Sequence, residues 1–237
     1  MESKLAGEAA PPRVDTLLVS DIHLGSAVSR AHDLLAELKK HSFRKLVLLG
    51  DVFDNLNFKR LRDDHWELLS YIRDLTKPEM AVEVVWILGN HDAPLESFSP
   101  FIGAEGTSEF LWKHAGKKYL AIHGHQFDSF LRRNKIFSTV AAYMFLTVQK
   151  FSGANQKFPR FLKKLSKGWL RLSKQVGQKA MAYAHTKGAT VVFCGHTHKA
   201  IHFSSGAVRY FNTGSSTDIP ASYITIAEDG TVTTHTY

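Results

Sequence analysis

The sequence lacks the features that would tie the fold to an oxidising compartment or to the membrane interior. Its single cysteine, Cys194, excludes an intramolecular disulfide. No run reaches the ~20 apolar residues of a membrane span, and the first residues lack the apolar segment of a secretory signal. We therefore expect a cytoplasmic protein in which residues 1–12 form a disordered N-terminal tail.

Acidic residues are missing from one long part of the chain. No Asp or Glu occurs between Ser129 and Thr217, whereas Lys and Arg recur throughout this segment, and the whole chain carries a formal net charge of +8. A one-sided charge distribution favours an anionic partner. Phosphate, nucleic acid and lipid head groups all meet this description.

Hydrophobic residues make up 44% of the 237 residues, which is enough to fill the core of a sizeable α/β domain. Five apolar runs each end at a polar cluster, as buried strands do. These runs cover residues 15–20, 44–50, 81–89, 117–122 and 189–195. Helical patterns over 31–40 and 64–74 lie between them, and a hairpin with an Asp229-Gly230 turn ends the chain. We expect at least roughly seven or eight strands, and we expect residues 13–237 to form a single domain.

Polar clusters follow the five predicted strands directly. They are Asp21-Ile22-His23, Asp51-Val52-Phe53-Asp54, Asn90-His91-Asp92, His123-Gly124-His125 and His196-Thr197-His198. The C-terminal ends of strands in α/β sheets line a common crevice, so we expect these side chains to lie together. One such His or Asp alone is usually structural, but five clusters at five strand ends indicate a site. Carboxylates with imidazoles, and without thiolates, suit divalent Mn, Fe or Zn.

The motif order D-x-H, G-D-x-x-D, G-N-H-D, G-H and G-H-x-H resembles the calcineurin-like metallophosphoesterase family, over about residues 17–213. The resemblance implies an α/β fold in which a β-sandwich is flanked by helices (α/β/β/α), with a helical lid or insert at about residues 128–187. It also implies two divalent metal ions, with Mn²⁺ expected and Fe, Zn or Mg as alternatives. One ion would be held by Asp21, His23 and His198. The other would be held by Asn90, His123 and His196, and Asp51 would bridge the two.

The resemblance also assigns the catalytic roles. Two such ions activate water for attack on a phosphate ester, which makes Asp51 essential. His91 resembles the family's histidine that steadies the transition state or protonates the leaving oxygen, although it could instead only orient a neighbour. We expect Asp54 and Asp92 to hold the ligands and their loops in place.

Within the family, the SDIHLG and GDVFD motifs and the long insert look most like bacterial UDP-2,3-diacylglucosamine pyrophosphohydrolases. Those enzymes release UMP and 2,3-diacylglucosamine 1-phosphate in lipid A biosynthesis. Two positions depart from their pattern, because His91 stands where they have Arg and His125 where they usually have Asp. Both positions border the reacting phosphate, so the substrate could differ.

The insert carries two helical patterns that bear on the substrate. Residues Phe158–Val176 form a basic amphipathic pattern, and Ile136–Val148 form a shorter, more apolar one that suits a lid or a membrane-surface element. The structural alternative is that these helices only pack on the core and on each other, while their lysines are solvated. We expect five residues to bind substrate: Lys163, Lys167, Trp169, Arg171 and His125. The expected substrate is a lipid-linked nucleotide, met at the anionic inner face of the cytoplasmic membrane.

A second interpretation of the same residues remains open. Basic side chains with interleaved aromatics also suit strand binding, so a soluble metal-dependent phosphodiesterase or nuclease acting on nucleotides or nucleic acid is the alternative. No protein partner can be inferred from the sequence.

Overall fold

A computed structural model describes residues 12–55, 57–92, 99–128 and 157–237, with side chains in the last range described from residue 168 onward. The predicted apolar helix Ile136–Val148 and nearly all of the predicted tail lie outside the described residues. None of the helices in the described part of the chain has an apolar stretch of membrane-spanning length.

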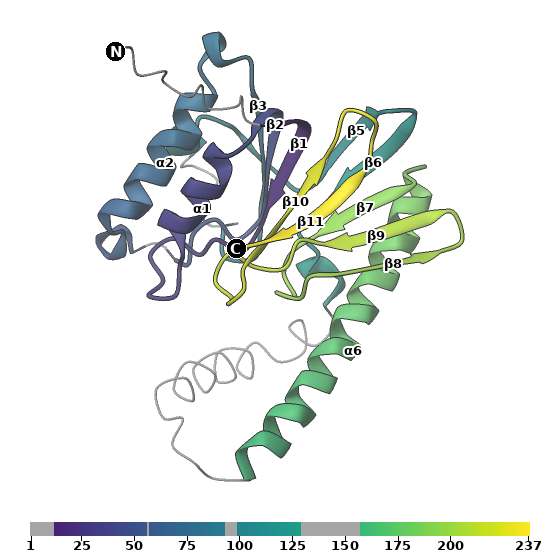
Figure 1. The fold of residues 1–237 in the computed structure, drawn as a ribbon. Helices are drawn as coiled ribbons and strands as arrows, with labels where there is room; N and C mark the ends of the chain where they lie inside the picture. Colours follow the sequence, from purple (N-terminus) through teal and green to yellow (C-terminus); the bar gives the residue numbers. More distant parts are fainter. Residues whose placement is uncertain (1–11, 56, 93–98, 129–156) are drawn as a thin grey trace, which may run out of the picture.

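Two β-sheets pack face to face and form the centre of the molecule (Figure 1). The first sheet has the strand order β11-β10-β1-β2-β3-β4, and the second has the order β5-β6-β7-β9-β8. The first sheet contains β1 (Arg13–Val19), β2 (Ser42–Leu49), β3 (Glu83–Ile87), β4 (Gly106–Thr107), β10 (Ser222–Ile226) and β11 (Val232–Thr236). The second contains β5 (Phe110–His114), β6 (Lys117–Ala121), β7 (Val191–Cys194), β8 (Ile201–Ser205) and β9 (Val208–Asn212).

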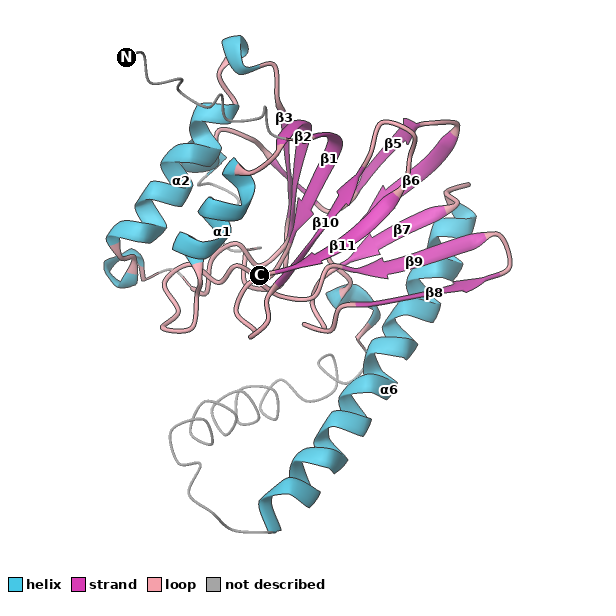
Figure 2. Ribbon diagram, in the orientation of Figure 1, coloured by secondary structure: helices cyan, strands magenta, loops and turns pink. Residues whose placement is uncertain are grey.

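Helices cover the two outer faces of this sandwich (Figure 2). Helices α1 (Ala31–Lys39) and α2 (Asp63–Leu75) cover the first sheet, and α6 (Lys157–Thr186) packs on β7 and β9 of the second. The shorter helices are η1 (Phe58–Arg60), η2 (Pro78–Met80), α3 (Ser99–Ile102) and η4 (His125–Phe127). The layers therefore run helix, sheet, sheet, helix, which confirms the predicted fold class.

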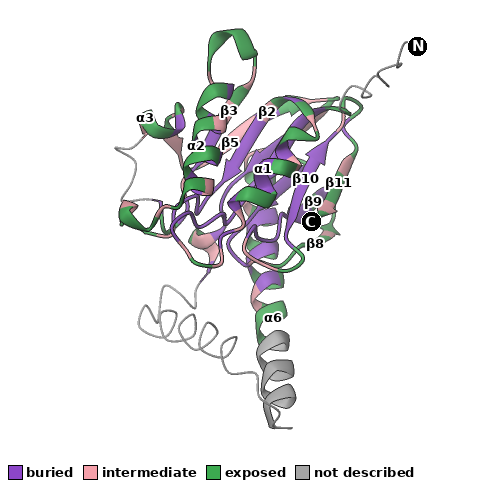
Figure 3. Ribbon diagram, turned by 60° about the vertical axis from the view of Figure 1, so that its left-hand side comes forward, coloured by how far each residue is buried: buried purple, intermediate pink, exposed green. Residues whose placement is uncertain are grey.

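The apolar runs of the sequence are continuous because the strands of the first sheet are buried on both faces. In β1, Leu17 and Val19 pack toward α1 and α2, whereas Leu18 between them packs toward the second sheet. Leu18 shares that inter-sheet core with the stacked rings of Trp112 and Phe193, whose centroids are 6.0 Å apart. Figure 3 shows the result, with buried strands beneath helices whose outer turns are exposed.

The parallel strands bring their C-terminal ends to one edge of the sandwich. Strands β1, β2 and β3 are parallel to one another, and so are β6, β7 and β9. Backbone hydrogen bonds continue the pairing into the loops: Asp21 N–H donates to Gly50 O at 3.0 Å and Gly195 N–H donates to His123 O at 3.1 Å. The five predicted polar clusters all leave from this edge.

The sequence pattern did not reveal every element. Strands β4, β5 and β8 were not predicted, and the amphipathic helix continues ten residues past Val176, to Thr186. In this continuation Ala180, Met181 and Ala184 are buried against the second sheet. The last part of the segment expected to be an insert is thus the outer helical layer of the second sheet.

Candidate metal centre

Most of the left-handed non-glycine residues in the described structure are predicted metal ligands. Of the seven such residues, five are Asp21, His23, Asp51, His196 and His198, with φ between 49° and 64°. This backbone conformation is strained for any residue that has a Cβ, and strained residues cluster at functional sites. The loops are therefore shaped to aim these five side chains.

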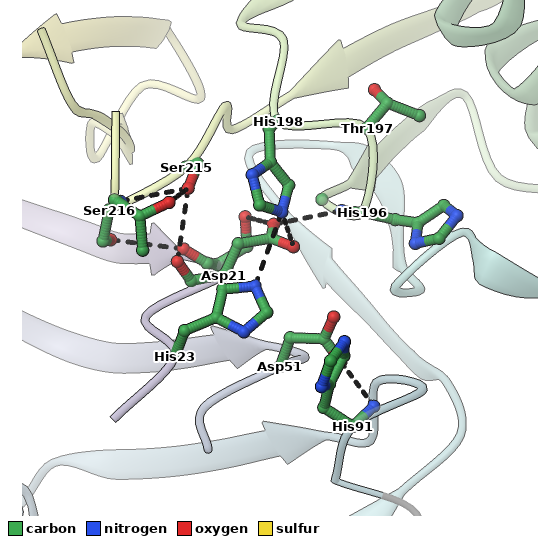
Figure 4. Close-up of polar contacts among 12 residues, drawn as sticks. Asp21, His23, Asp51, His91, His196, Thr197, His198, Ser215 and Ser216 are labelled. Atoms are coloured by element: carbon green, nitrogen blue, oxygen red, sulfur yellow. Dashed lines mark hydrogen bonds and ion pairs between the residues drawn. The ribbon is translucent and has the colours of Figure 1, made fainter. Parts of the chain in front are cut away.

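The three predicted ligands of the first ion lie together, and His198 contacts both Asp21 and His23 (Figure 4). His198 Nε2 lies 3.1 Å from Asp21 Oδ1 and 3.4 Å from His23 Nε2. The other Asp21 oxygen accepts a hydrogen bond from the His196 backbone N–H at 3.0 Å. One oxygen of Asp21 is thus used for support, and the other faces the two imidazoles.

His123 and Asp51 form a second contact beside the first. His123 Nδ1 donates to the carbonyl oxygen of Leu49 at 2.8 Å, so its Nε2 is the nitrogen that faces Asp51 Oδ2, 3.3 Å away. Gly89 allows this approach, because a Cβ there would overlap the Asp51 carboxylate. Asp51 Oδ1 accepts the backbone N–H of His91 at 2.8 Å.

The buried atoms at these contacts fit a cation. Asp21 Oδ1 and His123 Nε2 are both buried, and neither makes a hydrogen bond of normal geometry despite its close neighbour. Buried polar atoms are rarely left unsatisfied, and divalent cations bound beside them would satisfy each one. The ligand atoms form overlapping groups, each within 4.8 Å: Asp21, His23 and His198; His23, Asp51 and His91; and Asp21, Asp51 and His123.

Electrostatics at the centre follow from burial and from these pairs. Burial alone lowers the pKa of His123, but the carboxylates of Asp51 and Asp21 outweigh it and raise that pKa to about 9. Burial lowers the pKa of His23 to about 4. Burial opposes the charge of Asp51, yet the nearby imidazoles of His123 and His23 hold its pKa well below the usual range. The buried carboxylate of Asp51 is therefore ionised and attracts positive charge.

His196, assigned to the second ion, does not belong to these groups of His and Asp. The Nε2 atom of His196 lies 3.1 Å from the Asp128 carboxylate, so Nδ1 is the nitrogen left for a metal. Its ring centroid is 5.3 Å from that of His123. Asn90 is exposed in the turn after β3. A histidine ligand commonly gives its other nitrogen to a carboxylate, so the contact with Asp128 fits the predicted role.

Asp92 holds two of the ligand loops together. Its carboxylate accepts the backbone N–H groups of Val52 and Phe53, each at 3.1 Å, and of Gly89 at 3.2 Å. Burial, together with the charge of Asp51, raises the pKa of Asp92 to about 6. The carboxylate thereby fixes the turn that carries Asp51 against the turn that carries Asn90.

The sequence analysis missed a group of polar residues that supports the ligand loops: Asn212, Ser215 and Ser216. Asn212 Nδ2 donates to Gly195 O at 2.6 Å and to Thr197 Oγ1 at 3.2 Å, which supports the loop between the two histidine ligands. The other members support the start of the first loop: Ser215 Oγ donates to Asp21 O and Ser216 Oγ to Ser20 O (Figure 4). The run of small polar residues after β9 was the available signal.

Three of the five predicted substrate-binding residues have described side chains. Arg171 and Trp169 lie on α6, both exposed, and Trp169 Nε1 donates to Thr197 O at 2.6 Å. His125 lies beside the centre, with its ring centroid 5.4 Å from that of His123. The side chains of Lys163 and Lys167 lie outside the described part of the structure.

Comparison with known proteins assigns a family to this arrangement. The family model described as calcineurin-like phosphoesterase matches residues 15–200, which is more than half of the chain and spans all five motifs. No curated protein matches the sequence.

Solved structures that match this chain include proteins from E. coli, from an archaeon and from Chaetomium thermophilum. YfcE, a phosphoesterase from E. coli, is 18% identical, with 93% of this chain and 97% of that chain covered and a TM-score of 0.48. An archaeal phosphodiesterase is 10% identical, with 94% and 99% covered and a TM-score of 0.49. Vps29 of Chaetomium thermophilum is 11% identical, with 94% and 95% covered and a TM-score of 0.49.

Proposed function

Because the chain belongs to the calcineurin-like phosphoesterase family, and is thus a metal-dependent hydrolase, we propose that it uses two divalent ions to cleave a phosphodiester or pyrophosphate bond. One observation carries this proposal: the overlapping ligand groups share the buried carboxylates of Asp21 and Asp51. A carboxylate can bridge two neighbouring ions, and Asp51 lies close both to His23, assigned to one ion, and to His123, assigned to the other. Mn²⁺ is the ion we expect for this mixed carboxylate and imidazole set.

A pair of divalent ions held here would polarise the phosphoryl group and activate the attacking water. The protein's own contribution is to fix the ligands before any ion arrives. Asp92 and Asn212 hold the ligand loops, and Asp21 Oδ1 is buried without a hydrogen-bond partner beside the other ligand atoms. The strained backbone of five ligand residues is offset by these supports.

We propose His91 as the residue that moves a proton during the reaction. Its Nδ1 lies 2.7 Å from the carbonyl oxygen of Asp54, which can only accept, so Nδ1 carries a hydrogen. The other nitrogen, Nε2, is then the one available to substrate, and the side chain is exposed. In its protonated form His91 can donate from Nε2 to the leaving oxygen, as a general acid does.

The substrate we propose is a lipid-linked nucleotide such as UDP-2,3-diacylglucosamine, cleaved to UMP and a lipid phosphate. Support comes from α6, which borders the centre through Trp169 and exposes Arg171 and Lys174. Basic side chains next to an exposed aromatic ring suit an anionic lipid at a membrane surface. The same features suit nucleic acid, so a soluble phosphodiesterase or nuclease is the second candidate.

One substrate panel tests these proposals. With Mn²⁺ added, the protein is assayed on UDP-2,3-diacylglucosamine, bis-p-nitrophenyl phosphate, cyclic nucleotides and single-stranded DNA. Faster turnover of the lipid-linked nucleotide supports the first candidate, and faster turnover of DNA or cyclic nucleotides replaces it with the second. No turnover of any of them, with and without Mn²⁺, contradicts the proposed function.

Charge reversal on α6 sharpens the choice of substrate. Arg171→Glu with Lys174→Glu should weaken binding of the preferred anionic substrate in a salt-dependent way. The same change should leave hydrolysis of bis-p-nitrophenyl phosphate unaffected. Lys39→Glu with Arg73→Glu is the matched control, because these exposed residues lie on α1 and α2, over the other sheet. An equal effect of both pairs would show that α6 has no special part in binding.

A further inference from the structure

Helix α6 contacts the two loops that carry most of the predicted histidine ligands. Near its middle, the Trp169 indole N–H donates to the carbonyl oxygen of Thr197, the residue between His196 and His198. One turn later, Ser173 Oγ donates back to the Trp169 carbonyl oxygen at 3.0 Å. This serine is fully buried, so the side of α6 that carries it faces the interior.

Further along the helix, α6 contacts the loop after β6. Lys179 Nζ donates to Phe127 O at 3.1 Å, within the short helix η4 that His125 begins. Buried Val176 packs at Gly124, where an added Cβ would lie 3.5 Å from it. Residues 169, 173 and 176 recur at a spacing that puts them on one side of a helix. The side of α6 that faces the sandwich thus braces both loops.

The contact with Thr197 acts at a sensitive point. His196 and His198 are both held in the left-handed backbone region, and Thr197 lies between them. A left-handed residue with a Cβ returns to ordinary conformations unless the surroundings hold it. From one side Asn212 holds Gly195 O and Thr197 Oγ1, and from the other side Trp169 holds Thr197 O.

We propose that Trp169 is a positioning residue, through which α6 fixes the backbone between His196 and His198 and so the placement of one ligand for each ion. The positioning depends on the hydrogen bond from the indole N–H to Thr197 O, and it does not depend on the aromatic ring itself. The inference rests on the proposed function, because it needs the two ions. It also links the basic surface of α6 to the metal centre, since Arg171 and Lys174 lie on the same helix.

Three variants test the proposal against a substrate-binding role for the ring. Trp169→Phe keeps an aromatic ring and removes the N–H, whereas Trp169→Ala removes both. Trp66→Phe is the matched control, because Trp66 is similarly exposed, 43% against 47%, and lies on α2. Mn²⁺ affinity is measured by calorimetric titration of metal-free protein, and kcat and KM are measured with bis-p-nitrophenyl phosphate at saturating Mn²⁺. Circular dichroism confirms folding, and Trp169→Phe decides alone if Trp169→Ala does not fold.

We expect Trp169→Phe and Trp169→Ala to lower Mn²⁺ affinity alike, by about 10- to 100-fold, as loss of an outer support does. We expect kcat to fall in both, KM to stay constant, and Trp66→Phe to match the wild type. Wild-type Mn²⁺ affinity in Trp169→Phe, or a rise in KM alone, would overturn the inference and leave the proposed function intact. A wild-type protein that binds no Mn²⁺ would overturn the proposed function itself.

Discussion

The two halves of the metal centre are built differently. In the first half, formed by Asp21, His23 and His198, the ligand atoms already face one another at 3.1 and 3.4 Å. In the second half, His123 faces Asp51, but His196 is turned to Asp128 and Asn90 is exposed. The ligands of the first half come from the loops after β1 and β7 and already face one another, whereas in the second half His196 is held by a carboxylate from the segment after β6. We therefore expect the first half to bind its ion more tightly.

The largest effect should come from Asp51, which belongs to both halves. Asp51→Ala removes the shared carboxylate, so both ions should be lost and hydrolysis should fall to background. Elemental analysis and an assay on bis-p-nitrophenyl phosphate measure the two effects. Asp74→Ala, at an exposed position of α2, is the control. Two tightly retained ions with intact activity would rule out a shared centre.

Removing one histidine from each half tests the comparison directly. His198→Ala should abolish the tighter Mn²⁺ binding step, and His196→Ala should abolish only the weaker one, since the first half stays complete. Calorimetric titration of the metal-free variants separates the two steps. The account predicts a fall from two ions to one in both variants, with higher residual affinity in His196→Ala. The reverse order of affinities would refute the idea that the first half is the preorganised one.

His91 lies at the rim of both halves, and its replacement should affect turnover more than metal binding. His91→Ala should retain both ions and lower kcat by roughly 10²- to 10⁴-fold, the range for loss of a general acid or base. A parallel loss of metal and of rate would instead make His91 a ligand, since its ring lies 5.0 Å from that of His23. His91→Arg is a useful companion, because better turnover of the lipid-linked nucleotide in that variant would support the lipid substrate.

A smaller effect is expected at Asp128, whose carboxylate lies 3.1 Å from His196 Nε2. Asp128→Ala leaves His196 without this carboxylate and should weaken binding of the second ion by about 10- to 100-fold. The first ion provides the internal control, because His196 is not among its three expected ligands. If both Mn²⁺ binding steps weaken equally in titration, Asp128 supports the fold as a whole and the halves are not independent.

The sequence alone predicted the first half better than the supports of the second. The ligands follow apolar runs directly, and the parallel strands of both sheets bring the ends of these runs to one edge of the sandwich. The five runs became β1, β2, β3, β6 and β7. Strands β4 and β5 were missed because they are short or only half buried, without the continuous apolar run used to find the others.

Asp92 was predicted as a support and does hold the ligand loops, but Asn212 and Asp128 were missed, because each one meets its partner only through the folding of separate strands. Asn212 reaches Gly195 and Thr197 only because β9 runs beside β7, and Asp128 reaches His196 from the loop after β6. Trp169 was expected to bind substrate, but its indole N–H donates to Thr197 O. A helical pattern shows which residues share a face of the helix, and it does not show what that face contacts. The assignments of individual ligands to two ions stay predictions.

The most direct test of the central claim is the position of metal ions in crystals of the Mn²⁺-loaded protein. Anomalous diffraction at the manganese edge should show two peaks roughly 3.5–4 Å apart. The account predicts that both contact Asp51, that one also contacts Asp21, His23 and His198, and that the other contacts His196 through Nδ1. A single peak, or two peaks that do not share Asp51, would contradict it.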